Sequence, residues 1–146
     1  MSRFLLRSAV ATAFVGLFGL VGCSRSDGLP TYPVAGTVRV NGQPAASALV
    51  TFHPLGGQSS KPSGRVGDDG TFALTTREGG DGAPAGEYRV TVAWVAPAAG
   101  RKGVEGEDAP PRPLVPAEYT TPDRTPLRAS VAAGASDEIT LTIARK

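Results

Sequence analysis

The 146-residue sequence is poor in the side chains that most often bind metals or act as nucleophiles. It contains one cysteine, one histidine, one tryptophan and one methionine. A single cysteine cannot form an intrachain disulfide, and a blue copper site needs a thiolate together with two imidazoles. His53 has no nucleophile motif such as Gly-x-Ser-x-Gly elsewhere in the chain to pair with. These shortages lead us to expect no metal, no cofactor and no enzymatic activity.

The sequence also lacks a strong excess of charge. It has 15 Lys and Arg against 13 Asp and Glu. Arg3 and Arg7 belong to an N-terminal leader, and without them the remaining chain has 13 basic and 13 acidic residues, a net charge of zero. No basic run with interleaved aromatic residues is present. We therefore expect no binding to nucleic acid.

The leader itself is an apolar run that follows the two arginines. Residues 8–22 carry no charge, and the run is shorter than a typical bilayer span. It closes on Leu20-Val21-Gly22-Cys23, which resembles the lipobox of bacterial lipoproteins. The resemblance implies cleavage between Gly22 and Cys23 and attachment of acyl chains to the Cys23 thiol. The alternatives are an ordinary signal peptide with an incidental cysteine, or an uncleaved anchor helix.

These features predict three parts: a signal peptide over residues 1–22, a lipidated cysteine with its tether over 23–31, and one domain over 32–146. Burial of each acyl CH₂ contributes about 0.8 kcal/mol, so several chains on Cys23 give a durable membrane anchor. The tether is polar and spans at most about 30 Å when extended. We therefore predict a lipid-anchored protein of the cell envelope, on the periplasmic or outer-membrane face.

Apolar and polar residues alternate with period two through the expected domain, which is typical of half-buried strands. The alternation predicts strands around 34–40, 48–53, 71–75, 88–94, 127–131 and 139–143, with a seventh around residues 65–66. Each strand has one apolar face, so two sheets must bury these faces together. The prediction is an all-β sandwich with Greek-key connections. Phe52, Phe72, Tyr88 and Trp94 all fall on the inward phase.

Two turns are predicted from their residue types. Asn41-Gly42 is the strongest short hairpin signal, because a type I′ turn needs positive φ at both positions, and we expect the 48–53 strand to return beside the 34–40 strand. Asp68-Asp69-Gly70 precedes the 71–75 strand. Its carboxylates, with Asp81, could bind calcium, but the EF-hand spacing and terminal glutamate are missing. A plain β-turn is therefore our interpretation.

The longest connection runs from Ala96 to Pro116 and mixes prolines with charges. Such a composition favours disorder over packed structure. Its acidic cluster, Glu105, Glu107 and Asp108, is interpreted as a solvated surface. His53, just before Pro54, is expected on the outward face of its strand.

Three stretches resemble carboxypeptidase regulatory-like domains: YPVAGTVRVNGQP at residues 32–44, DDGTFAL at 68–74 and PAGEYRVTV at 84–92. YTTP at 119–122 and TPL at 125–127 further resemble small lipoproteins of planctomycete bacteria. The resemblance implies a seven-stranded transthyretin-like (prealbumin-like, Ig-like) sandwich. Tyr88 follows a Pro-Ala-Gly turn, where it forms either a tyrosine corner, with its hydroxyl on nearby backbone, or a simple core aromatic.

These observations together predict a non-enzymatic accessory or interaction module that binds an envelope protein through an exposed edge strand or the long loop. The alternative is a carbohydrate- or small-ligand-binding envelope protein. That alternative needs exposed aromatic side chains, and only Tyr32 and Tyr119 are expected at the surface.

Overall fold

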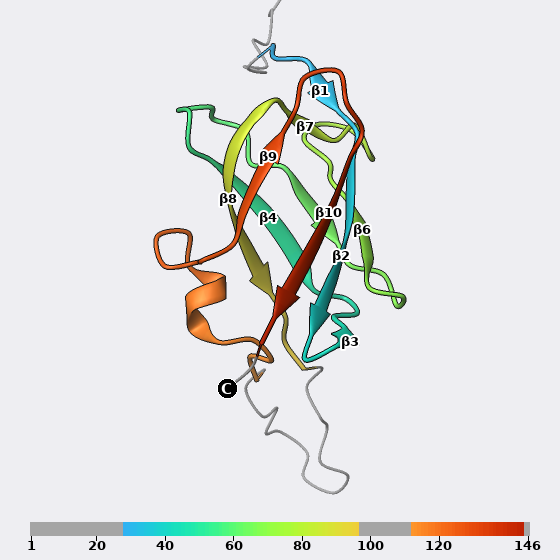
Figure 1. Cartoon of the computed structure of the whole chain (residues 1–146), viewed down its shortest axis with the longest axis vertical. Helices are drawn as coiled ribbons and strands as arrows, with labels where there is room; N and C mark the ends of the chain where they lie inside the picture. The colour runs from blue at the N-terminus through green and yellow to red at the C-terminus, as the bar shows by residue number, and fades with distance from the viewer. Residues whose placement is uncertain (1–27, 97–111, 145–146) are drawn as a thin grey trace, which may run out of the picture.

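The computed structural model describes residues 28–96 and 112–144, and these form an all-β structure. Two four-stranded sheets face each other as a β-sandwich-like body, and a two-stranded ribbon closes one end (Figure 1). A short 3-10 turn, η1 (Ala117–Thr120), lies beside them. Within these residues no helix is long and apolar enough to cross a bilayer.

The first sheet is built around β2 (Val34–Val40). β10 (Asp137–Ile143) pairs with β2 in parallel over seven residues, from Asp137 opposite Val34 to Ile143 opposite Val40. On the other side of β2 lie β3 (Gln43–Pro44) and β6 (Thr71–Ala73), both antiparallel to it. β10 is therefore an edge strand of this sheet.

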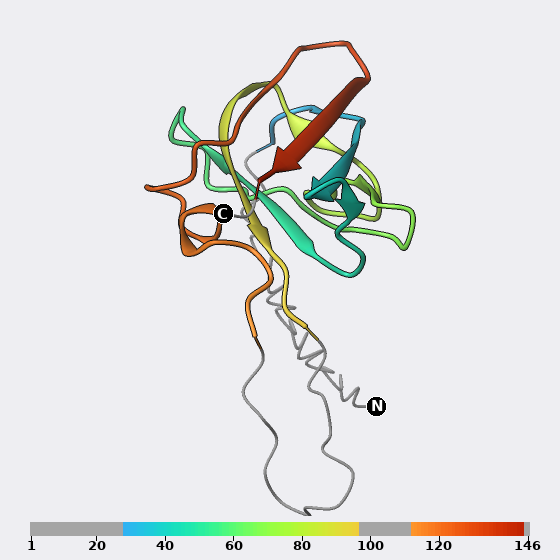
Figure 2. The same ribbon diagram turned by 60° about the horizontal axis from the view of Figure 1, so that its bottom comes forward.

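The second sheet is antiparallel throughout and has the order β5, β4, β8, β9. Its members are β5 (Ser63–Arg65), β4 (Leu49–Pro54), β8 (Gly86–Ala93) and β9 (Arg128–Val131). The ribbon at one end pairs β1 (Thr31–Tyr32) with β7 (Ala83–Pro84). Figure 2 shows the two sheets as separate layers, with β2 and β10 in one and β4 and β8 in the other.

The core lies between the sheets, and it confirms the inward phase predicted for most strands. Its fully buried side chains come from both layers: Val38, Ile143, Leu74, Val50, Phe52, Tyr88, Val90 and Val92. On β2 the buried residues alternate with Ala35 and Arg39, which are exposed. Burial of each such side chain contributes roughly 1.5–3 kcal/mol, so the alternation that predicted the strands also supplies the main stabilising term.

Gly36 is the one inward position of β2 without a side chain, and a close approach requires this. A Cβ built there would collide with the Ile139 carbonyl oxygen and would lie 2.9 Å from the Phe72 ring. Phe72 on β6 is the cross-strand partner of Gly36. The ring thus occupies the space that a larger residue would need.

The turn predicted after β2 is present, but the prediction that the 48–53 strand returns beside β2 is wrong. The turn has positive φ at Asn41 (50°) and Gly42 (81°), but the strand that returns beside β2 is only the two-residue β3. The Ala45 N–H still donates to the Val38 carbonyl (3.1 Å), but the Val38 N–H is bonded to the Gly70 carbonyl (2.8 Å) instead of returning that bond. The Ala48 N–H then donates to the Ala45 carbonyl (3.0 Å) in a second turn. The chain then crosses to the opposite sheet, where β4 pairs with β5 and β8.

Smaller differences concern strand limits and burial. The predicted 71–75 strand ends at Ala73, and β9 begins at Arg128, so Leu127 precedes it. Thr91 lies on the outward phase as expected but is only 7% exposed, because His53 contacts it and η1 packs against β8. The ribbon strands β1 and β7 were not predicted, since two residues are too few to show alternation.

The sandwich has two distinct ends. β2, β8 and β10 all finish at the end that carries β3, and β1 lies at the opposite end (Figure 1). The described chain enters at the β1 end, where the Arg77 guanidinium donates to the Leu29 carbonyl (2.6 Å). The candidate site lies at the β3 end.

Candidate functional site

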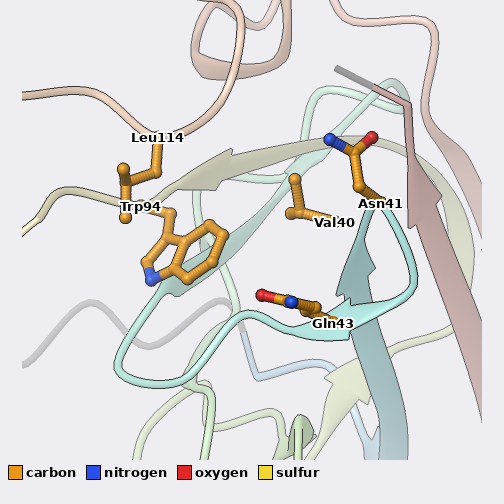
Figure 3. A pocket seen from close by; sticks show the side chains of 5 residues that line it. All are labelled: Val40, Asn41, Gln43, Trp94 and Leu114. Carbon is orange, nitrogen blue, oxygen red and sulfur yellow. The ribbon is translucent and has the colours of Figure 1, made fainter.

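A hollow of about 330 Å³ lies at the β3 end of the sandwich and opens to solvent. Among the residues that the structure describes, five side chains line it: Val40, Asn41, Gln43, Trp94 and Leu114. Figure 3 shows them around a common space, with the indole nitrogen turned away from the other four. We call this the Trp94 hollow.

Local backbone structure brings these residues together from three segments. Val40 ends β2, and the positive-φ turn at Asn41 and Gly42 carries Gln43 back along its edge. Trp94 follows directly after β8, and its carbonyl accepts a hydrogen bond from the Leu114 N–H (2.7 Å). This bond ties the residues on either side of the 97–111 segment to each other and places Leu114 beside the indole.

The Trp94 side chain is held in a fixed orientation. Its Nε1–H donates to the Ala46 carbonyl at 2.9 Å, which satisfies the only polar atom of the ring. The side chain is half-buried and packs against the edge of the core. The prediction of Trp94 as a core aromatic is therefore wrong in part, because β8 ends at Ala93 and the next inward position lies at the rim of the core.

The described residues that line the Trp94 hollow are all uncharged. Val40 and Leu114 are apolar, while Asn41 and Gln43 each bear a primary amide that can both donate and accept hydrogen bonds. Gln43 is exposed, and its amide makes no hydrogen bond within the part of the chain that the structure describes. The site can therefore offer an aromatic surface and neutral hydrogen-bonding groups to a ligand.

A second hollow, of about 380 Å³, lies beside η1 and has a different character. It is lined by Pro116, Ala117, Glu118, Tyr119, Arg124 and Ala144. Its rim thus carries a carboxylate and a guanidinium in addition to the tyrosine ring. Tyr119, expected at the surface, is half-buried here.

Tyr88 combines both of the roles considered for it. The side chain is fully buried, and its ring lies 5.5 Å from that of Phe52 between centroids. The hydroxyl donates to the Pro84 carbonyl at 2.7 Å, with Gln58 Oε1 a longer contact at 3.2 Å. Burial raises the pKa of the Tyr88 hydroxyl, so it stays neutral in the folded protein at ordinary pH.

His53 lies on the outer face of the second sheet and not in either hollow. Its Nε2 is 2.9 Å from Thr91 Oγ1, and its cross-strand partner Arg89 forms an ion pair with Asp123 at 2.9 Å. Burial lowers the pKa of His53, and the positive charge of Lys61 lowers it further. The imidazole is half-buried and bonded to Thr91. These contacts indicate that His53 helps to pack the outer face of the second sheet.

The acidic turn before β6 is held by its own hydrogen bonds. Asp69 Oδ1 accepts from the Thr71 N–H (3.0 Å) and hydroxyl (2.7 Å), and Gly70 has a φ of 88°. These bonds lower the pKa of Asp69. Asp81 instead accepts from the Thr76 N–H (2.6 Å) in its own loop. Among the described residues no group of three His, Cys, Asp or Glu side chains could hold a metal ion.

Several predicted features lie outside the described residues: the cleavage site at Gly22 and Cys23, and residues 97–111 with their acidic cluster. The loop predicted over 96–116 extends too far at its C-terminal side. Residues 112–116 are packed, since the Ala96 N–H donates to the Arg112 carbonyl (2.9 Å) and Val115 is buried.

Comparison with protein-family models, with curated proteins and with solved structures finds no match to this chain.

The Trp94 hollow itself was not predicted from sequence. Its apolar members belong to an alternating strand and to a proline-rich loop, which are distant in the chain. One signal was available: Trp94 is the last inward residue of a long alternating run. An aromatic side chain at a strand end lies at the margin of a core, where it is accessible to ligands.

Proposed function

We propose that this chain is a lipoprotein of the bacterial cell envelope, anchored by acyl chains on Cys23, whose domain binds another envelope protein without catalysing a reaction. Supporting the anchor is the run Leu20-Val21-Gly22-Cys23, with Cys23 the single cysteine of the chain. We further propose the seven-stranded Greek-key, transthyretin-like topology. Its strands would be β2, β4, β5, β6, β8, β9 and β10, with the two-residue β1, β3 and β7 as additions.

The observation that carries the binding role is the outer edge of β10. At the two ends of the ladder, the Asp137 N–H donates to the Pro33 carbonyl (3.2 Å) and the Ile143 carbonyl accepts from the Asn41 N–H (3.0 Å). Alternate residues of a parallel strand bond to the same neighbour. The backbone groups of Glu138, Thr140 and Thr142 therefore face away from β2.

No strand of the described chain pairs with this outer edge. Seven residues in extended conformation present an edge of about 23 Å. An unpaired edge of that length is a template for an added strand from a partner. The exposed side chains beside it, Glu138, Thr140 and Thr142, include two β-branched residues that suit cross-strand packing.

The anchor is tested by replacing the thiol. Cys23→Ala is expected to abolish incorporation of labelled palmitate and to release the protein from the membrane fraction, whereas Ser24→Ala, the adjacent control, retains both. Membrane attachment by wild-type protein with an unmodified Cys23 would contradict the proposal.

The β10 edge is tested by a proline at its centre. Thr140→Pro removes an N–H that faces away from β2, so the fold is retained, as circular dichroism can check. In-cell cross-linking followed by mass spectrometry is expected to recover an envelope protein with wild type and with the control Thr140→Val. Recovery of the same protein by Thr140→Pro in equal yield would rule out strand addition at this edge.

A further inference from the structure

We propose that the Trp94 hollow binds a neutral saccharide. This inference goes beyond the proposed protein-binding role and does not depend on it, since the hollow lies at the β3 end and involves no residue of β10. The proposal is based on the kind of surface that the five lining residues present, on its rigidity and on its size.

The aromatic wall of the site is already ordered. The Trp94 indole is fixed through its bond to Ala46, and its backbone through the bond from Leu114. A ligand that stacks on this ring therefore immobilises no flexible aromatic side chain, which reduces the entropy cost of binding. Because Nε1–H is already used, the ring offers only its carbon surface to the ligand.

The polar wall is neutral and points to a neutral ligand. Gln43 supplies an exposed amide with donors and an acceptor, and the Asn41 side chain at the same rim is also uncharged. The Arg39 guanidinium, near the same turn, donates to the Gly42 carbonyl (3.3 Å) and is not among the described residues that line the hollow. On those lining residues a charged ligand would lose hydration without meeting an opposite charge. A sugar ring suits both the apolar indole surface and the neutral polar wall. Its C–H face packs on an aromatic ring, while its hydroxyls can bond to the Gln43 amide.

The size of the hollow fits a short part of a saccharide. At about 330 Å³ it lies near the lower limit of ligand sites, which enclose about 300–1,000 Å³. Because the hollow opens to solvent, one or two rings can enter while the rest of a longer chain remains outside. Proline-rich peptides need a groove lined by several aromatic rings, and this site has one.

The second hollow does not share these properties. Glu118 and Arg124 place opposite charges on its rim, so a neutral sugar gains no preference there. Its Tyr119 nevertheless provides a matched aromatic control for the role of Trp94.

The test uses Trp94 as its own reporter, because it is the single tryptophan of the chain. The protein is titrated with cellotriose, maltotriose and triacetylchitotriose, with trigalacturonate as a charged counterpart and a proline-rich decapeptide as a competing class. We expect a saturable change in Trp94 emission with at least one neutral trisaccharide, at a Kd of about 1 mM. We expect no such change with trigalacturonate or the peptide.

Variants then assign the binding to this hollow by calorimetry. Gln43→Ala is expected to weaken the affinity about 5-fold or more, and Trp94→Leu to abolish detectable binding. Tyr119→Leu and Thr142→Ala, which alter the second hollow and β10, should bind as wild type does. The proposal is overturned if no neutral sugar binds at concentrations up to about 20 mM, if only the charged sugar or the peptide binds, or if Gln43→Ala binds as tightly as wild type.

Discussion

The hydroxyl of Tyr88 offers the sharpest test of how this fold is held together. Tyr88→Phe removes one oxygen from a fully buried site and leaves the ring in contact with Phe52. The Pro84 carbonyl, which accepts the hydroxyl at 2.7 Å, then loses its partner in a buried environment. An acceptor left unsatisfied in this way costs about 1–3 kcal/mol.

The expected change is a lower free energy of unfolding by about 1–2 kcal/mol. Since small domains have urea m-values of about 1–3 kcal/mol/M, the midpoint should fall by roughly 0.3–2 M. Trp94 fluorescence can follow the transition, because Trp94 is the single tryptophan. Tyr119→Phe is the matched control, since the Tyr119 hydroxyl has no partner among the described residues.

The pH dependence gives a second, independent measurement. Burial raises the pKa of Tyr88 in the folded state, so its contribution to stability is fully present below the unfolded-state pKa near 10 and is lost as pH rises through the folded-state pKa. The difference between wild type and Tyr88→Phe should therefore shrink above about pH 10. Equal urea midpoints for wild type and Tyr88→Phe at pH 7 would refute the argument.

Two further predictions concern the packing around Gly36 and the charge near His53. Gly36→Ala places a Cβ against the Ile139 carbonyl and the Phe72 ring and should lower the free energy of unfolding by about 2–4 kcal/mol, whereas Gly56→Ala, with open space around it, should change the urea midpoint little. Lys61→Met should raise the pKa of His53 towards its ordinary value of 6.5 by removing a nearby positive charge, as NMR titration of this single imidazole can measure. An unchanged Gly36→Ala midpoint, or a His53 titration that does not move, would contradict the respective packing or electrostatic argument.

The fold class could be predicted because alternation with period two is a local property. Val34, Val38 and Val40 had to share one face of any extended strand, and in the structure they share the buried one. The assignment of strands to sheets could not be predicted in the same way, because it depends on where a chain crosses between layers. The crossing follows from the bond of the Val38 N–H to the Gly70 carbonyl and from the turn at Ala45, and alternation carries no information about either.

The candidate site was predictable only in its parts. The sequence predicted Trp94 as a core residue and Asn41-Gly42 as a hairpin turn, and it assigned neither to a binding site. Their proximity results from β2 and β8 ending at the same end of the sandwich, which is a long-range consequence of topology. Leu114 joins them through a backbone bond to Trp94, across a segment whose composition suggested no packing at all.

The parallel pairing of β2 with β10 has a mechanical consequence. The chain enters β2 at one end of the sandwich and leaves β10 at the other (Figure 1). Tension applied between these two points pulls along both strands, so the seven-residue ladder is loaded in shear and its hydrogen bonds must rupture together. The antiparallel pairs of the second sheet lie outside this line of force. A domain tethered on the N-terminal side of β2 and loaded on the C-terminal side of β10 would resist extension through this parallel ladder.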